Sequence, residues 1–131
     1  MEQMNYYHTK EVNLPFGAAL TRTKEALADK GFGVITEIDL KEKFKEKLGV
    51  DFREYRILGA CNPKMAHQAI GQEARIGVLL PCNVLVQEHT DGKVEVSAVN
   101  PMETMSAVAN KNLEEIAEEV SLKLKEAIDS I

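Results

Sequence analysis

An Asp-Gly dipeptide at 91–92 lies between two alternating apolar segments, and it constrains the fold more than any other feature of the sequence. Segments 82–89 and 93–99 have the period of half-buried strands. Asp-Gly favours the left-handed backbone of a two-residue hairpin turn, so we expect these strands to be antiparallel neighbours. With the dipeptide as the whole turn, Cys82 faces Pro101 across the hairpin.

Local signals predict the other helices and strands. Asp39 and Glu42 have the spacing of a capping box. Asn-Pro at 62–63 and again at 100–101 is typical of a helix start, because asparagine caps and proline tolerates the first position. The predicted elements are strand 5–12, helix 14–30 after Asn13, strand 33–38, helix 40–48, strand 52–61, helix 63–71, strands 82–89 and 93–99, and helical segments from 101 and from 113.

The element order β-α-β-α-β-α-β-β-α predicts a single α+β domain over residues 1–131. Strands joined through helices can run parallel, whereas the final hairpin is antiparallel. We therefore expect a mixed sheet of about five strands in two layers, with the helices mainly on one face. In strand 52–61, Glu54 and Arg56 alternate with the residues expected to face the core, which are Tyr55, Ile57, Gly59 and Cys61.

Charge and composition exclude several classes of partner. The net charge is −5, and the lysines of segment 41–47 are interleaved with glutamates, so no nucleic-acid partner is expected. No apolar stretch approaches the roughly 20 residues of a membrane span, so no membrane partner is expected. Residues 1–10 lack the pattern of a secretion signal, and two cysteines are too few for a disulfide framework. These observations favour the cytoplasm.

Each cysteine is followed by asparagine, at Cys61-Asn62 and Cys82-Asn83. Cys61 directly precedes one predicted helix start, and the hairpin brings Cys82 beside the other, at Asn100. A helix start has unpaired N–H groups and a partial positive charge, which lower the pKa of a nearby thiol and attract anions. We therefore expect these five residues to converge at one end of the sheet, as a binding site for a small molecule or an anion.

Other uses of the cysteines stay open. Cys61 and Cys82 are also consistent with buried packing, or with a thiol redox or metal-handling protein. A zinc site is disfavoured, because His67 lies on the polar side of its helix and His89 points to the opposite face from Cys82. No phosphate loop, dinucleotide fingerprint or serine elbow is present, and no general base can be named. The sequence therefore assigns no reaction and no cofactor.

The segments "ILGACNPKMAHQAI" (57–70) and "IGVLLPCNVLVQE" (76–88), with the later "VNP", resemble the bacterial and archaeal domain of unknown function 302 family. The resemblance covers nearly the whole chain and is most specific at Gly59, Asn62-Pro63 and Leu80-Pro81. It implies one small α+β domain with a sheet backed by helices, often forming a homodimer. It implies no reaction and no catalytic residue.

A homodimeric interaction module is therefore a third candidate function. The adjacent Tyr6 and Tyr7 place one aromatic ring on each face of the first strand. Such rings are enriched in interfaces, because they bury a large area at little cost in entropy. A homodimer is the expected oligomeric state.

Overall fold

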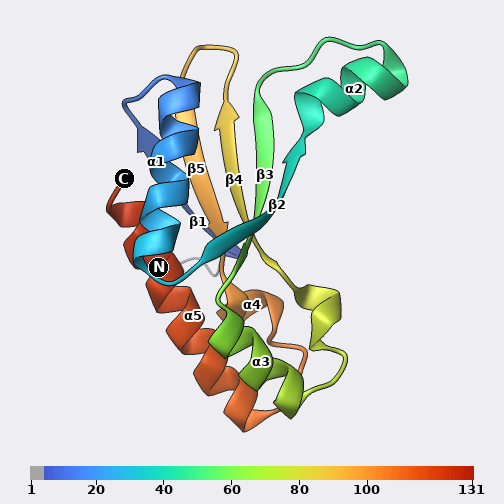
Figure 1. The fold of residues 1–131 in the computed structure, drawn as a ribbon, viewed down its shortest axis with the longest axis vertical. Helices are drawn as coiled ribbons and strands as arrows, with labels where there is room; N and C mark the ends of the chain where they lie inside the picture. Colours follow the sequence, from blue (N-terminus) through green and yellow to red (C-terminus); the bar gives the residue numbers. More distant parts are fainter. Residues whose placement is uncertain (1–4) are drawn as a thin grey trace.

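One antiparallel sheet, flanked by helices, forms the body of the protein (Figure 1). The computed structural model describes residues 5–131. Its strands are β1 (Tyr7–Val12), β2 (Gly33–Asp39), β3 (Tyr55–Cys61), β4 (Cys82–Glu88) and β5 (Val94–Val99). Its helices are α1 (Phe16–Asp29), α2 (Leu40–Leu48), α3 (Pro63–Gln72), the 3-10 turn η1 (Ile76–Leu79), α4 (Pro101–Thr104) and α5 (Lys111–Asp129).

The strand order is β1-β5-β4-β3-β2, and every neighbouring pair is antiparallel. The α+β class is confirmed, but the expectation of a mixed sheet is wrong. Parallel neighbours need a connection that crosses the sheet from end to end. Helices α2 and α3 instead lie beyond the strand ends, where α2 connects β2 to β3 and α3 connects β3 to β4 (Figure 1). Helix α1 connects β1 to β2, the two edge strands of the sheet.

Helices α1 and α5 cover one face of the sheet. In β1, β3, β4 and β5 the even-numbered side chains lie on that face, among them Leu58 and Ala60, which are almost completely buried. The prediction for β3 was therefore wrong, because its odd-numbered residues lie on the other face. We call this other face the open face; no helix of the described residues covers its centre, and Ile57 and Leu85 are paired there.

Arg56 explains why the two faces of β3 were exchanged in the prediction. Its guanidinium lies over the Phe16 ring, 5.8 Å from the centroid, and contacts Glu37 at 2.6 Å. A long side chain of this kind buries its stem while its charge finds a partner at the rim. An arginine in a strand can therefore lie on the core face, and its charge alone does not show that this face is exposed to solvent.

The β4–β5 hairpin has a three-residue loop in place of the predicted two-residue turn. Glu88 pairs with Val94, and the His89 N–H donates to the Lys93 carbonyl at 2.8 Å. Gly92 adopts a left-handed backbone with φ of 89°. The register is shifted by one residue, so its continuation places Cys82 opposite Asn100.

Polar side chains cap most of the helices. Asp39 caps α2 by accepting from the Glu42 N–H, as predicted. Asn62, Asn100 and Asn110 cap α3, α4 and α5 in the same way. Helix α1 begins later than expected, after Pro15, and has no side-chain cap. Among the helices of residues 5–131, none combines the length and apolar character needed to cross a bilayer.

Two clusters of buried side chains lie along α5. The larger one fills the space between the sheet, α1 and the second half of α5. The smaller one lies beyond the lower end of the sheet in Figure 1, where α3, α4 and η1 gather around the first half of α5. Ile116 packs against both clusters.

Candidate functional site

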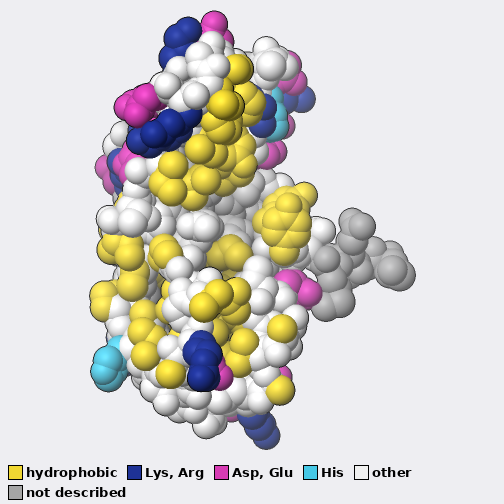
Figure 2. Space-filling view, turned by 90° about the vertical axis from the view of Figure 1, so that its right-hand side faces the viewer, with side chains coloured by type: hydrophobic (Ala, Val, Ile, Leu, Met, Phe, Trp, Pro, Cys, Tyr) yellow, Lys and Arg dark blue, Asp and Glu magenta, His cyan; other side chains and the backbone are white. Residues whose placement is uncertain are grey.

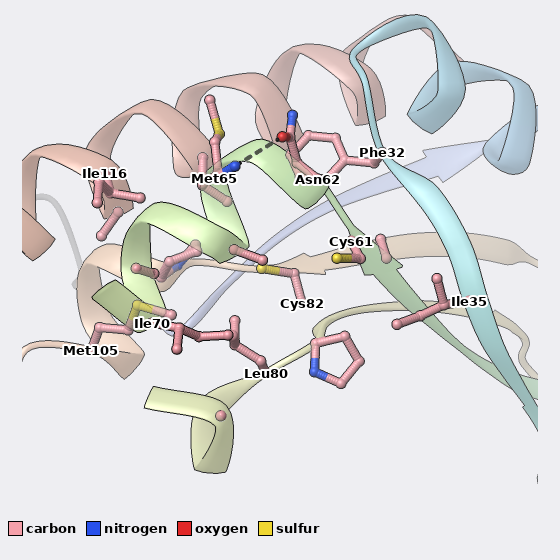
Figure 3. Close-up of a pocket in the computed structure, with 18 residues that line it drawn as sticks. Phe32, Ile35, Cys61, Asn62, Met65, Ile70, Leu80, Cys82, Met105 and Ile116 are labelled. Carbon is pink, nitrogen blue, oxygen red and sulfur yellow. Dashed lines mark hydrogen bonds between the residues drawn. The ribbon is translucent and has the colours of Figure 1, made fainter. Parts of the chain in front are cut away.

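A cavity of about 340 Å³ lies at the lower end of the sheet, between the two clusters (Figure 3). Strands β3 and β4, helices α3 and α5, and the segment that contains η1 contribute its walls. Its lining residues are Phe32, Ile35, Ala60, Cys61, Asn62, Met65, Ala66, Ala69, Ile70, Gly77, Leu80, Pro81, Cys82, Pro101, Met105, Ile116, Ala117 and Val120.

Strand pairing brings the two cysteines to this cavity. Ala60 pairs with Cys82, and Cys61 follows Ala60 in the chain. The Cα atoms of the cysteines are therefore less than about 10 Å apart, since consecutive Cα atoms are ~3.8 Å apart and paired ones ~5.5 Å. Both thiols are free. Consecutive strand residues point to opposite faces, so Cys61 borders the cavity from the side of the open face and Cys82 from the helix side.

The environment of Cys82 keeps its thiol neutral. The side chain is buried, with 7% of its surface exposed. Burial, and to a smaller extent the nearby Cys61, raises the pKa of Cys82 to about 11. The expectation that a helix start lowers the pKa of this thiol is wrong, because loss of hydration outweighs the effect of the helix dipole at this depth.

Of the predicted asparagines, only Asn62 lines the cavity. Its side-chain oxygen is used locally, because it accepts from the Met65 N–H at 3.2 Å and so caps α3 (Figure 3). Asn83 is exposed on the open face, where it borders a different hollow. Asn100 caps α4 and also accepts from Ser121 Oγ at 2.8 Å. The structure thus brings together Cys61, Asn62 and Cys82, and places the other two elsewhere.

The mouth of the cavity is apolar as well. Ile35 and Ile70, which are 62% and 50% exposed, lie on opposite sides of it, with Leu80 between them (Figure 3). Ile35 falls within an irregularity of the β2–β3 ladder, between Val34 and Thr36. Apolar side chains reach the surface over much of this side of the molecule (Figure 2). An apolar molecule can therefore approach the cavity without passing a ring of charges.

The lining contains no charged side chain, and Asn62 is the only amide in it. In residues 5–131, no group of three or more His, Cys, Asp or Glu side chains is arranged to hold a metal ion. His67 is exposed on α3, and His89 lies 3.4 Å from Glu95 at the other end of the sheet. The chemistry available in the cavity is therefore apolar contact, together with the sulfur atoms of its wall.

Sequence reasoning missed most of the lining. Phe32 and Met105 are two of the lining residues that no sequence motif indicates. One available signal was segment 76–82, "IGVLLPC", which is uncharged and apolar although it contains a loop. Loops usually lie at the surface and are polar, so an apolar loop indicates that it covers something apolar.

Comparison with known proteins gives a family and no activity. The family model described as "Domain of unknown function DUF302" matches residues 8–131. A crystal structure of an uncharacterized conserved DUF302 protein from Bacillus stearothermophilus superposes with a TM-score of 0.88 and 28% sequence identity. The match covers 95% of this chain and 96% of that one. No curated protein matches. Because the family model spans nearly the whole chain, the protein belongs to the DUF302 family.

Proposed function

We propose that this protein binds a neutral, apolar small molecule in the cavity at the lower end of the sheet. The observation that carries the proposal is the lining, in which an open space of about 340 Å³ is walled almost entirely by aliphatic, sulfur-containing and aromatic side chains. Ligand sites of small molecules are concave and mostly apolar, and their volumes begin at about 300 Å³. The cavity is open at its mouth, so a ligand that removes its apolar lining from water is stabilising.

The lining favours this ligand class over an anion. No lysine or arginine side chain borders the cavity. The helix start that does border it is already capped by Asn62, whose oxygen takes the Met65 N–H. An anion would therefore lose its hydration without gaining a cation, which is unfavourable.

Thiol redox chemistry is less well supported as the main function. Cys82 is buried, and its pKa is raised to about 11, whereas a reactive thiol needs a lowered pKa and access to solvent. Free thiols fit a reducing compartment, so we place the action of the protein in the cytoplasm. Cys61 is half-buried at the cavity and contributes to its wall.

A titration with cyclohexane, followed by ¹H–¹⁵N NMR, tests the proposal. We expect saturable shifts at the amides that surround the cavity. Ala66 on α3 lines the cavity, so Ala66→Phe should fill it and abolish the shifts. Ala18 is exposed on α1, so Ala18→Phe introduces the same ring elsewhere and should leave binding intact. Shifts that do not saturate, or that persist in Ala66→Phe, would contradict the proposal.

We also propose that the open face of the sheet is the surface on which two copies associate. Large side chains lie on it without a covering helix in the described part of the chain, including Tyr7 at 39% and Ile38 at 42% exposure. Five strands spaced ~4.8 Å apart and about 20 Å long present roughly 500 Å² of sheet surface. This is more than half of the ~800 Å² that a stable interface buries on each partner, and Tyr6 at the edge adds to it.

Sedimentation equilibrium at micromolar concentration tests this second proposal. Leu85 lies near the centre of the open face, so Leu85→Lys should produce a monomer from a dimeric wild type. Leu122 is 58% exposed on α5, and Leu122→Lys should leave the dimer unchanged. A wild-type chain that sediments as a single 14.6 kDa species would rule out association.

A further inference from the structure

Sulfur-containing side chains are concentrated at the cavity. Residues 5–131 contain five of them, and four line this one space (Figure 3). They approach from different parts of the fold: Cys61 ends β3, Met65 lies on α3, Cys82 begins β4 and Met105 follows α4. Only Met102 is absent from the lining. Because strand, helix and loop all deliver sulfur to the same place, the cavity presents an unusually polarisable surface.

Sulfur discriminates between kinds of apolar ligand. A sulfur atom about 5 Å from an aromatic ring, often at its edge, gains a favourable contact that a saturated ring does not offer. Met65, Cys82 and Met105 are each at least 91% buried, so their sulfur atoms belong to the wall and are not free in solvent. A flat aromatic molecule in the cavity would therefore be surrounded by sulfur-containing side chains from several parts of the fold.

The volume sets the size of this ligand. The cavity, at about 340 Å³, is at the small end of the ~300–1,000 Å³ range of small-molecule sites. A compact molecule of about two fused six-membered rings therefore suits it better than a larger, drug-sized one. The absence of charged side chains from the lining requires the ring system to be neutral.

We propose that the cavity selects a neutral, two-ring aromatic molecule over a saturated molecule of the same skeleton, through the sulfur atoms of Met65 and Met105 together with the two thiols. This inference rests on the proposed function, because it names the class of ligand for the same cavity. Methionine also serves as an adaptable filler of irregular space. Leucine would fill nearly the same volume without sulfur, so the two roles can be separated by substitution.

The experiment compares naphthalene with decalin, its saturated counterpart, by NMR titration of the whole protein. The measured quantity is the ratio of their two dissociation constants. The two probes differ in general hydrophobicity, but this difference is the same for every variant, so a change in the ratio reports the substituted side chains. Met65→Leu/Met105→Leu should reduce the preference for naphthalene by at least about fourfold, since one sulfur–aromatic contact corresponds to roughly a twofold to tenfold change in affinity. Met102→Leu, outside the lining, should leave the ratio unchanged.

Each outcome decides the question. An unchanged ratio in the double variant, with both probes bound, overturns the selection of aromatics and leaves the proposed function standing. Binding of neither probe to the wild type overturns both. Should the double variant fail to fold in a thermal unfolding assay, the single variants Met65→Leu and Met105→Leu replace it, each with an expected reduction of about twofold or more.

Discussion

Cys82 pairs with Ala60 across β3 and β4, which leaves Cys61 one residue beyond the last pair that these two strands form. This offset gives two chemically identical groups unequal surroundings. Cys82 lies under the helices with 7% of its surface exposed, whereas Cys61 is half-buried at the strand end. The two thiols should therefore differ in reactivity.

We predict that iodoacetamide at pH 8 modifies Cys61 at least about tenfold faster than Cys82. With its pKa raised to about 11, Cys82 is thiolate in only about one molecule in a thousand at this pH, and its burial blocks access. Peptide mass spectrometry of samples quenched over time measures both rates. In concentrated urea the two rates should become equal. Faster labelling of Cys82 in the native protein would contradict the described burial.

Gly59 should not tolerate a side chain. A Cβ atom at this position would overlap Thr36 Oγ1 and lie 2.8 Å from Pro81 Cγ. We expect Gly59→Ala to lower the free energy of unfolding by ~1–3 kcal/mol, the usual cost of overpacking. Gly33 in the neighbouring strand has nothing within 4 Å of the added atom, so Gly33→Ala serves as the control. Urea unfolding measures the free energy of unfolding of both variants. An equal loss in the two would exclude a steric role for Gly59.

Asn100 should contribute to stability and not to ligand binding. Its oxygen accepts from the Met102 N–H at 3.1 Å and from Ser121 Oγ at 2.8 Å, so it ties α4 to α5. Asn100→Ala should cost ~1–2 kcal/mol in unfolding free energy, a typical value for a lost cap. Asn83→Ala, at an exposed position, should cost less than about 0.5 kcal/mol. An Asn100 variant of normal stability with weakened cyclohexane binding would reverse this assignment.

Glu37 should make stability depend on pH in the acid range. Hydrogen bonds from Lys24 and Arg56 lower the pKa of this carboxyl below its ordinary value of 4.5. Because the folded pKa is the lower one, the contribution is complete above pH 4.5 and is lost as the pH falls through the folded pKa. Glu37→Gln should therefore cost up to about 1 kcal/mol at pH 7 and nothing at a pH below the folded pKa.

A series of urea unfolding curves between pH 2.5 and pH 7 would test this, the range being set by the carboxylate pKa of about 4. Glu25→Gln is the matched control. Glu25 is 65% exposed, and its ion pair with Arg22 is weak because the two charged atoms are 4.0 Å apart. Its stability difference from the wild type should stay small at every pH. If the difference in unfolding free energy between Glu37→Gln and the wild type is the same at every pH, the stabilising effect of the Glu37 carboxylate is contradicted.

The sequence was sufficient for the parts of the fold that depend on local chemistry. The α+β class, the boundaries of most elements, and the caps at Asp39, Asn62 and Asn100 follow from periodicity and from the side-chain oxygens that start helices. These features depend on a few consecutive residues, so tertiary packing does not override them.

The features that sequence reasoning misplaced depend on long-range pairing. One extra loop residue, Thr90, shifts the hairpin register and moves the partner of Cys82 from Pro101 to Asn100. The core face of β3 depends on Arg56 lying over Phe16, which no alternation pattern encodes. Asn83 follows a cysteine as Asn62 does, but it belongs to strand β4, where it pairs with Gly59, and so its side chain faces away from the cavity.

The placement of two buried clusters along α5 has a consequence for how the protein opens. The 19 residues of α5 contribute Leu113 and Ala117 to the smaller cluster, and Leu124 and Ile128 to the larger one. The smaller cluster lies beyond the sheet and has no strand ladder to hold it, so we expect it to unfold as a separate cooperative unit of lower stability. Amide hydrogens of α3 should then exchange with deuterium before those of β4. A molecule that fills the space between the units joins them, and should make them exchange as one.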